Sequence, residues 1–436
     1  MSHHKPHIAY KDTGIQWLGR VPSHWMIAQL KRISSLNPKK SSMIEEKQSQ
    51  CTFVPMEKLR TNAVTLDEVR TVEEVYDGYS FFCDGDILIA KVTPCFENGN
   101  IAIADGLVNG IGFGSTEINV IRTNAKCDTR YLFYRLQDDQ FKAVATAEMR
   151  GTGGLKRVPT EIFESYRIGL PPIPEQAKIA CTLDRETKRI DSLIEKKSLF
   201  IDLLKEKRKA LIATAVTKGI NNKAKMKDSG VKWIGQVPEH WDVVPSTWLF
   251  TESKERAHED DQHLSATQKY GVIPLAEYER LEERQVTHAV KNLEQRKHVE
   301  LDDFVISMRS FQGGIERVKA RGCVRSSYVV IQAEASANKD YFSYLFKSGS
   351  YIQGLQATSS FIRDGQDLNY GNFRQVRLPK PDLDEQRHIA MFLDQETKRI
   401  DALVKATEHS VSLLKERRSA FITAAVTGQI DLRGSE

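Results

Sequence analysis

The chain has 436 residues, more than one hydrophobic core usually organises, and this length indicates about two to four domains. Its 40% hydrophobic and 28% charged residues are typical of a globular protein and exclude a disordered or fibrous one. No apolar run approaches the roughly 20 residues of a membrane-spanning helix. Residues 1–10 contain no apolar stretch like that of a secretory signal. We therefore expect a cytoplasmic protein with no membrane partner.

The cysteines and the charge distribution narrow the class further. Six cysteines lie far apart with no Cys-x-x-Cys pair, which argues against a zinc ribbon and a disulfide scaffold and favours a reducing compartment. The net charge is only +5, but residues 196–232 hold eleven Lys or Arg against three acidic residues. This local excess would attract a polyanion, although a solvated helix face explains it equally well.

Two segments of the chain each occur twice in the sequence. Residues 12–25, DTGIQWLGRVPSHW, recur as 228–241, DSGVKWIGQVPEHW, at an offset of 216, with eight of fourteen positions identical. We call this segment the tryptophan motif. Residues 175–220 recur as 385–430 at an offset of 210, around an identical ETKRID core. Repeated segments on either side of two dissimilar segments predict a symmetric frame that carries two different recognition segments.

The two dissimilar segments are residues 26–169, the first block, and residues 242–377, the second block. Their closest similarity is GDILIAKV at 85–92 against DDFVISMR at 302–309, an acidic start followed by a short apolar run typical of a strand. Further strands are predicted at 101–104, 118–121 and 328–331, and short amphipathic helices at 130–141 and 340–348. Each block is therefore expected to be a mixed α/β globule.

Long helices are predicted from about Glu175 to Val216 and again in the second copy. Apolar residues recur there at steps of three and four with no internal Gly or Pro, which favours a helix of about 40 residues. A helix that long cannot bury its apolar seam alone, so we expect the two copies to pair antiparallel as a coiled coil with a pseudo-two-fold axis. The alternative is that each seam packs on its own neighbouring domain. The seam residues are Leu183, Ile190, Leu204 and Leu211 in the first helix and Leu393, Ile400, Leu414 and Phe421 in the second.

At this point the motifs resemble a known family over nearly the whole chain. They are the WxGxVPxHW sequences at 17–25 and 233–241, the LPPIPEQ and LPKPDLDEQ junctions that begin at Leu170 and Leu378, and the ETKRID helices with their Ala-Val-Thr ends. Their duplicated order is more specific than any one of them. The chain resembles the specificity subunit of type I restriction-modification systems.

The resemblance implies an α+β fold in which two α/β target-recognition domains are separated by two long antiparallel helices. Each domain would read one half of a bipartite, asymmetric site in double-stranded DNA. The helices would set the unread spacer and dock two methyltransferase subunits, and restriction/translocase subunits would join. The expected boundaries are 1–169 for the first recognition domain, 170–220 for the first spacer helix, 221–377 for the linker and second recognition domain, and 378–436 for the second helix and C-terminal tail. The source would be prokaryotic.

Motifs for chemistry are missing from the chain. It has no Asp/Asn-Pro-Pro-aromatic tetrapeptide of an adenine methyltransferase and no GxxxxGK[ST] phosphate loop. The Gly-rich residues 151–154 follow a segment that looks like a helix end, so a flexible loop is favoured over a cofactor cradle. His24 and His240 occupy equivalent repeat positions, which favours a structural role. We therefore expect no catalytic residue, no metal site and no cofactor in this chain, with S-adenosylmethionine, ATP and Mg used by partner subunits.

Basic and amide side chains beside Gly-rich or polar loops are the candidates for DNA contact, because Arg pairs with guanine and Gln or Asn with adenine. The alternative to a base contact is, for each residue, a solvated position in a loop or a contact to a phosphate. The candidates are Lys91, Thr93, Arg150, Lys156 and Arg157 in the first block and Arg309, Ser310, Gln312, Arg363, Gln366 and Asn369 in the second.

Two other functions fit parts of the sequence. A coiled-coil scaffold with two globular ends would bind proteins rather than DNA. A fused methyltransferase-nuclease would carry out the chemistry itself, but the missing motifs argue against it. Retention of one bipartite duplex at raised salt would separate a DNA reader from a scaffold of the same net charge.

Overall fold

The computed structural model describes residues 5–40, 48–285, 295–307, 310–358 and 369–434. The chain divides into two compact units, Met1–Ser198 with His409–Glu436 and Leu199–Glu408. Two long helices, α5 (Ile173–Lys218) and α11 (Leu383–Val426), contribute to both units. Each unit therefore combines one block with part of each helix.

The first unit contains two four-stranded sheets. Their strands are β4 (Ser34–Leu36), β5 (Gln50–Val54), β8 (Val69–Thr71), β9 (Ser80–Cys83), β10 (Ile87–Ala90), β11 (Ile101–Ile103), β12 (Ile111–Gly114) and β13 (Ile118–Thr123). One sheet has the order β11-β10-β13-β4 and is antiparallel; the other has the order β8-β5-β12-β9, with β5 and β12 parallel. Only glycine fits at position 112 of β12, because a Cβ would lie 2.3 Å from the ring of Phe82.

Short helices and strand pairs complete the first unit. The helices are α1 (Val72–Val75), α2 (Thr129–Arg135), α3 (Asp139–Ala147) and α4 (Thr160–Ser165). The strand pairs are β1 (Tyr10–Asp12) with β2 (Arg20–Pro22), β3 (Met26–Gln29) with β16 (Arg167–Leu170), β6 (Leu59–Arg60) with β7 (Ala63–Val64), and β14 (Arg150–Thr152) with β15 (Leu155–Arg157). The tryptophan motif thus runs from the last residue of β1 through β2 and leads directly into β3.

The second unit repeats this plan with fewer strands. Its strands are β17 (Met226–Asp228), β18 (Gln236–Pro238), β19 (Asp242–Pro245), β20 (Phe250–Ser253), β21 (Leu264–Thr267), β22 (Gly271–Pro274), β23 (Lys297–Val299), β24 (Phe304–Ile306), β25 (Glu316–Arg317), β26 (Gly322–Val324), β27 (Val329–Ala333) and β28 (Arg377–Lys380). Its short helices are α6 (Leu275–Glu282), α7 (Ser310–Gly313), α8 (Lys339–Lys347), α9 (Gly349–Gln356) and α10 (Tyr370–Gln375). The main sheet has the order β20-β27-β24-β25.

The faint similarity between 85–92 and 302–309 marks equivalent strands. It falls on β10 in the first unit and on β24 in the second. β10 pairs antiparallel with β13, which precedes α2, and β24 pairs antiparallel with β27, which precedes α8. The predicted strands at 101–104, 118–121 and 328–331 correspond to β11, β13 and β27. The two blocks therefore share a strand plan that their sequences barely retain.

One helix prediction needs correction. The pattern at 130–141 predicted a single helix, but the structure has α2 and α3 separated at residues 136–138. Asp138 starts a new helix there, because its backbone is extended and its carboxylate accepts a hydrogen bond from the Phe141 N–H. Ser348 plays the same part between α8 and α9, where its hydroxyl accepts from the Tyr351 N–H.

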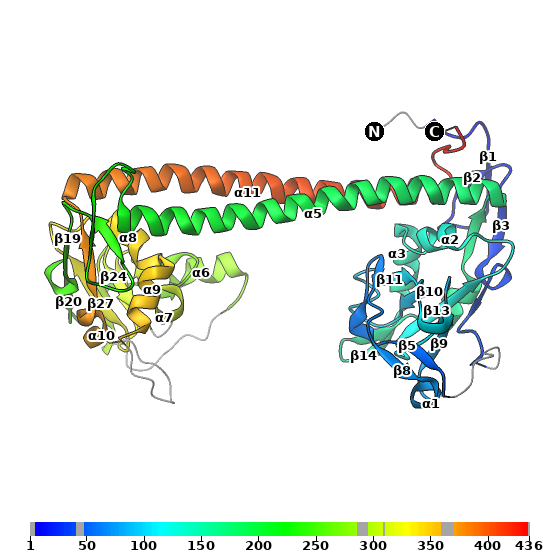
Figure 1. Cartoon of the computed structure of the whole chain (residues 1–436), viewed down its shortest axis with the longest axis horizontal. Helices are drawn as coiled ribbons and strands as arrows, with labels where there is room; N and C mark the ends of the chain where they lie inside the picture. The colour runs from blue at the N-terminus through cyan, green and yellow to red at the C-terminus, as the bar shows by residue number, and fades with distance from the viewer. Residues whose placement is uncertain (1–4, 41–47, 286–294, 308–309, 359–368, 435–436) are drawn as a thin grey trace. The chain divides into compact units, whose positions relative to one another are not determined.

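The two long helices pair antiparallel, as the repeat predicted. In the first unit Arg418 of α11 lies 2.9 Å from Asp191 of α5, and in the second unit Arg208 of α5 lies 3.0 Å from Asp401 of α11. These residues are related by the repeat offset of 210, since 191 corresponds to 401 and 208 to 418. The same ion pair therefore occurs in each unit with the two helices exchanged. Within each unit the helices lie side by side (Figure 1).

Most seam residues are buried. Leu183, Ile190, Leu204, Leu393 and Ile400 are at most 7% exposed, whereas Leu211, Leu414 and Phe421 are partly buried. The expected α+β fold with two globules and a helical pair is confirmed.

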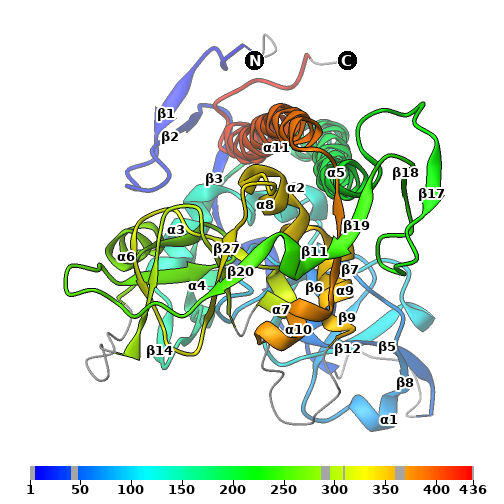
Figure 2. The ribbon, with the colours of Figure 1, turned by 90° about the vertical axis from the view of Figure 1, so that its left-hand side faces the viewer.

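Each block is fixed to the start of one helix and the end of the other. In the first unit the buried Tyr131 hydroxyl of α2 donates to the carbonyl of Val426 at the end of α11. In the second unit Tyr341 of α8 donates to Val216 at the end of α5. Figure 2 shows α8 directly beneath the two helices. The core of each unit accordingly mixes block residues with both helices.

Candidate nucleic-acid interface and its supporting frame

The first set of candidate DNA-contact residues comes together on one hairpin. Arg150 pairs with Arg157, and Gly151 with Lys156, across β14 and β15. Gly153 and Gly154 both have positive φ, +64° and +82°, the backbone that a tight two-residue hairpin turn requires. The prediction of a flexible loop at 151–154 is therefore wrong, because two left-handed glycines close a regular turn between paired strands.

Thr93 attaches this hairpin to the first block. Its hydroxyl donates to the Gly154 carbonyl at 2.6 Å and accepts from the Lys156 N–H at 2.9 Å. Val92 also bridges to Arg157. Thr93 is only 9% exposed, so it holds the hairpin rather than presenting its side chain to DNA.

The hairpin presents positive charge to solvent. All residues from 150 to 157 are exposed, and β14 lies on the side of the first unit away from α5 (Figure 1). Arg157 forms a bidentate contact with Glu117, in which Nη2 of the arginine lies 2.6 Å from Oε1 of the glutamate. This hydrogen bonding lowers the pKa of the Glu117 carboxyl. Within the described part of the chain, Arg150 and Lys156 have no salt-bridge partner. Lys91 adjoins the hairpin through a backbone bond from the Val158 N–H to its carbonyl.

The second set of candidates does not assemble in the same way. Arg309, Arg363 and Gln366 lie outside the described residues. Ser310 is 1% exposed, and its hydroxyl accepts from the Ser307 N–H, so it has almost no surface for a ligand.

Two members of that set are exposed. Gln312 lies on α7. Asn369 forms the N-cap of α10, where its carbonyl oxygen accepts from the Asn372 N–H at 3.2 Å. Residues 359–368, which lie outside the described residues, come between α9 and α10 in chain order, as the hairpin of the first block comes between α3 and α4.

A second arrangement, the clasp, joins each tryptophan motif to its following long helix. His24 Nε2 lies 2.8 Å from Glu175, and Trp25 donates to the same carboxylate at 3.0 Å. The second copy repeats both contacts from His240 and Trp241 to Glu385, each at 2.9 Å. The structural role expected for His24 and His240 is confirmed.

A glutamine follows each clasp glutamate and fixes the block. Gln176 accepts from the Asp128 N–H and donates to the Lys126 and Pro171 carbonyls. Gln386 makes the same three contacts with Asn338, Ser336 and Pro381. Sequence reasoning noted the repeated Glu-Gln pair but gave it no role. The repeat offset was the signal, because a polar pair that recurs in register at a helix start needs a partner.

A tyrosine on each block binds the first third of the long helix that follows it. The Tyr134 hydroxyl donates to Asp184 at 2.8 Å and lies 3.1 Å from Thr187, and Tyr344 repeats this with Asp394 and Thr397. Burial raises the pKa of Tyr344 to about 12, so its hydroxyl remains a donor at neutral pH. Clasp, glutamine and tyrosine together hold two unlike blocks by one set of contacts.

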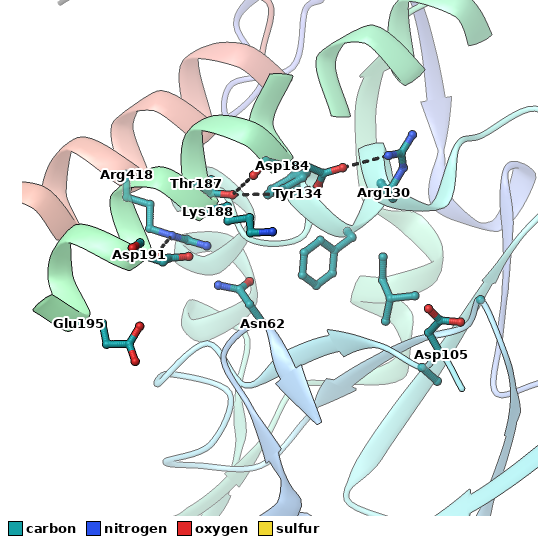
Figure 3. Close-up of a pocket in the computed structure, with 15 residues that line it drawn as sticks. Asn62, Asp105, Arg130, Tyr134, Asp184, Thr187, Lys188, Asp191, Glu195 and Arg418 are labelled. Atoms are coloured by element: carbon teal, nitrogen blue, oxygen red, sulfur yellow. Dashed lines mark hydrogen bonds and ion pairs between the residues drawn. The ribbon is translucent and has the colours of Figure 1, made fainter. Parts of the chain in front are cut away.

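Figure 3 shows a cleft of about 840 Å³ in the first unit, between the first block and the helices. Asp184, Asp191 and Glu195 of α5 line it, and Arg130 and Arg418 pair with the first two of these carboxylates. Both of its arginines are thus engaged, and its four carboxylates, with Asp105 and Glu195 included, outnumber the three positive groups that Lys188 completes. A polyanion gains little there, so the cleft belongs to the frame and the hairpin is the better DNA surface.

Comparison with known proteins shows a similarity to one class of protein. The family model described as the type I restriction modification DNA specificity domain matches residues 22–200. That span covers the first block, the clasp and the first half of α5.

Individual relatives agree with the class. The chain is 33% identical to the EcoEI specificity subunit of Escherichia coli over 197 residues, 44% of this chain and 33% of that protein. It is 31% identical to the EcoAI specificity subunit over 230 residues, 52% of this chain and 38% of that one. The matches thus span little more than a third of these relatives. A putative MjaX specificity subunit of Methanocaldococcus jannaschii is 21% identical over 432 residues, 95% of this chain and 96% of that protein.

Solved structures share the fold. A chain from a structural study of complex assembly in a type I R-M system has a TM-score of 0.71 at 17% identity and covers 95% of this chain and 99% of its own length. The HsdS subunit from Thermoanaerobacter tengcongensis has a TM-score of 0.54 at 18% identity, with 94% and 98% covered. The chain is thus similar to type I specificity subunits, as its repeated motifs predicted. Neither a scaffold nor a fused methyltransferase-nuclease is supported.

Within the described ranges, no helix is long and apolar enough to cross a membrane.

Proposed function

We propose that this chain is the sequence-reading subunit of a type I restriction-modification complex, in which each block reads one half of a bipartite, asymmetric DNA site. The observation that carries the proposal is the frame. Identical contacts, from His24 and His240 to their glutamates and from Gln176 and Gln386 to their blocks, hold two blocks of different sequence. The same supporting contacts around two blocks of different sequence suit two independent recognition events.

The β14-β15 hairpin is the proposed reading element of the first block. The major groove of B-DNA admits a two-stranded β-ribbon, and Arg or Lys there pairs with guanine. Arg150 and Lys156 are exposed on such a ribbon and have no salt-bridge partner among the described residues, while Arg157 is held by Glu117 and positions the strand. For the second block, Gln312 and Asn369 remain candidates together with Arg309, Arg363 and Gln366.

Exchange of residues 26–169 for the corresponding block of a relative tests the proposal. We expect only one half of the recognised site to change, because the clasp residues and Gln176 all lie outside the exchanged segment. Gln176 contacts only the backbone of that segment. The readout is the genomic methylation pattern in cells that carry the complex. The reciprocal exchange of residues 242–377 is the matched control and should change the other half. A simultaneous change in both halves would refute independent readers.

Two docking sites for a methyltransferase subunit are proposed on the helices. Leu193 and Leu203 of α5 are 41% and 53% exposed, and their repeat equivalents on α11, Leu403 and Leu413, are 44% and 50% exposed. Large apolar side chains kept on the surface at equivalent positions indicate a covering partner. Because each position occurs twice, two copies of the same subunit fit.

Substitution of one leucine should remove one partner copy. We expect Leu413→Lys to weaken docking at its site about tenfold or more, which corresponds to about 1.4 kcal/mol. The complex measured by mass photometry would then hold one methyltransferase subunit instead of two, and Leu203→Lys should do the same. Leu155→Lys, at a leucine 58% exposed on the hairpin turn, is the control and should leave two. Retention of two copies in both helix variants would exclude these leucines as docking residues.

The remaining activities are assigned to partners. Methyl transfer from S-adenosylmethionine to adenine and ATP- and Mg-dependent cleavage are proposed to reside in the methyltransferase and restriction/translocase subunits, and this chain is proposed to be non-catalytic. The motifs absent from its sequence support that division. The proposed location is the prokaryotic cytoplasm, where the DNA and these partners are found.

A further inference from the structure

His7 lies beside the clasp of the first unit, where it could join His24 and Glu175 as a metal ligand. His7, His24 and Glu175 each offer one ligand atom, a ring nitrogen or a carboxylate oxygen, and these three atoms lie within 4.8 Å of one another. The rings of His7 and His24 are tilted, with their centroids 5.5 Å apart. The sequence predicted no metal site, because these three residues are far apart along the chain and match no ligand motif.

His7 is buried without a satisfying partner. Its side chain is 2% exposed, and its Nδ1 has no hydrogen-bond partner in the described structure. The nearest acidic atom, Asp431 Oδ2, is 3.7 Å away, beyond hydrogen-bond range, and that carboxylate is held by Arg433. A buried polar atom left unpaired costs free energy comparable to a lost hydrogen bond. A ligand for this nitrogen would remove that cost.

We infer that His7, His24 and Glu175 form a zinc site that closes the clasp of the first unit. Two imidazoles and one carboxylate suit zinc and other borderline transition metals rather than Mg or Ca. Tetrahedral zinc holds its ligand atoms roughly 3.3 Å apart, so small side-chain movements convert the present cluster into a site. The fourth position is left for water or for Asp431.

The carboxylate is already oriented for this role. Trp25 Nε1 donates to Oε1 of Glu175 at 3.0 Å, which leaves Oε2 facing His24 at 2.8 Å. A donor on the second oxygen of a metal-binding carboxylate is the usual outer-shell arrangement. In the first unit Trp25 thus fixes the ligand geometry without touching the ion.

The site would tie both ends of the described chain to the frame. His7 precedes β1, whose Tyr10 hydroxyl donates to the Gly428 carbonyl, and the Asp431 N–H donates to the Lys5 carbonyl. A metal bound by His7, His24 and Glu175 would therefore fasten the N-terminal segment, the tryptophan motif and the start of α5 beside the end of α11. It would strengthen the contact between the N-terminal and C-terminal segments within the first unit.

The second copy supplies an internal control. His240, Trp241 and Glu385 repeat the clasp, but the repeat offset of 216 places Lys223 where the first copy has His7. Lys223 is exposed, and a protonated amine does not bind zinc. One ion per chain is therefore expected, not two.

The test is a zinc titration of the full chain after removal of metal with a chelator, followed with a competing fluorescent chelator. We expect one tightly bound equivalent, a zinc-dependent rise in the unfolding temperature, and a tetrahedral cobalt spectrum with nitrogen and oxygen ligands when Co²⁺ is substituted. His7→Ala should weaken zinc binding about tenfold or more and abolish the rise in unfolding temperature. His7→Gln, which keeps a polar side chain, covers the case in which the alanine variant fails to fold.

Two controls separate this site from other zinc ligands. His240→Ala removes the equivalent clasp histidine of the second copy and should leave binding unchanged. The double variant His3→Ala/His4→Ala removes the other N-terminal histidines and should also leave it unchanged. The inference would be overturned if the unaltered chain bound no zinc tightly, or if both His7 variants bound zinc as tightly as the unaltered chain. A loss of zinc binding in the His3→Ala/His4→Ala variant would also overturn it.

Discussion

The double variant Arg150→Ala/Lys156→Ala is expected to weaken binding of the cognate duplex by about 30-fold or more. Each Arg or Lys contact to a base or phosphate contributes roughly 1–3 kcal/mol, so two lost contacts cost about 2 kcal/mol at least. Both side chains are exposed on β14 and β15 and lack a salt-bridge partner in the described structure, so removing them should not destabilise the fold. The measurement is a titration of the assembled complex with its duplex at two salt concentrations.

The salt dependence shows which contacts were lost. If both residues contact phosphates, the slope of log affinity against log salt falls by about one per residue, and binding weakens for every sequence. If either reads a base, discrimination at one position of one half-site relaxes. Lys126→Ala, which removes an exposed positive charge of the same unit outside the hairpin, should change little. Unchanged affinity and unchanged specificity in the double variant would mean that the hairpin is not the reading element.

Insertion of seven residues into both long helices is expected to lengthen the unread spacer of the DNA site by about three base pairs. Seven residues are about two helical turns and add about 10 Å at 1.5 Å per residue, against roughly 3.4 Å per base pair. The insertions belong between Lys197 and Ile201 and between Thr407 and Val411, so that the Asp191–Arg418 and Asp401–Arg208 pairs stay intact. Mapping of methylated sites in cells that carry the altered complex gives the new spacer directly.

An insertion of five residues at the same places is the matched control. Five residues rotate the following helix by about 140°, at 100° per residue, so Ile190 and Leu204 can no longer lie on one continuous seam. We expect that variant to unfold at lower temperature or to lose its partners, whereas the seven-residue variant keeps both half-sites. A seven-residue variant that folds and methylates with the original spacer would show that the helices do not measure the DNA.

The sequence by itself determined the organisation of this protein. The offset repeats of the tryptophan motif and the ETKRID segment predicted two like frames. The apolar periodicity, unbroken by Gly or Pro, predicted α5 and α11, because that pattern can be read directly from the sequence. The equivalence of His24 and His240 was enough to predict their structural role. The family resemblance also followed from these motifs, since they are short, ordered and duplicated.

Only the tertiary structure decided which side chains meet. The hairpin that carries Arg150 and Lys156 has a local signal, the Gly153-Gly154 turn, but the bond from Thr93 that fixes the hairpin joins residues 61 apart and leaves no local signal in the sequence. The partners of Glu175, and the burial of His7 beside them, depend on contacts about 150 residues or more apart. Local patterns report which elements form, whereas such long-range contacts depend on how the elements pack, so the candidate zinc site could not have been read from the chain alone.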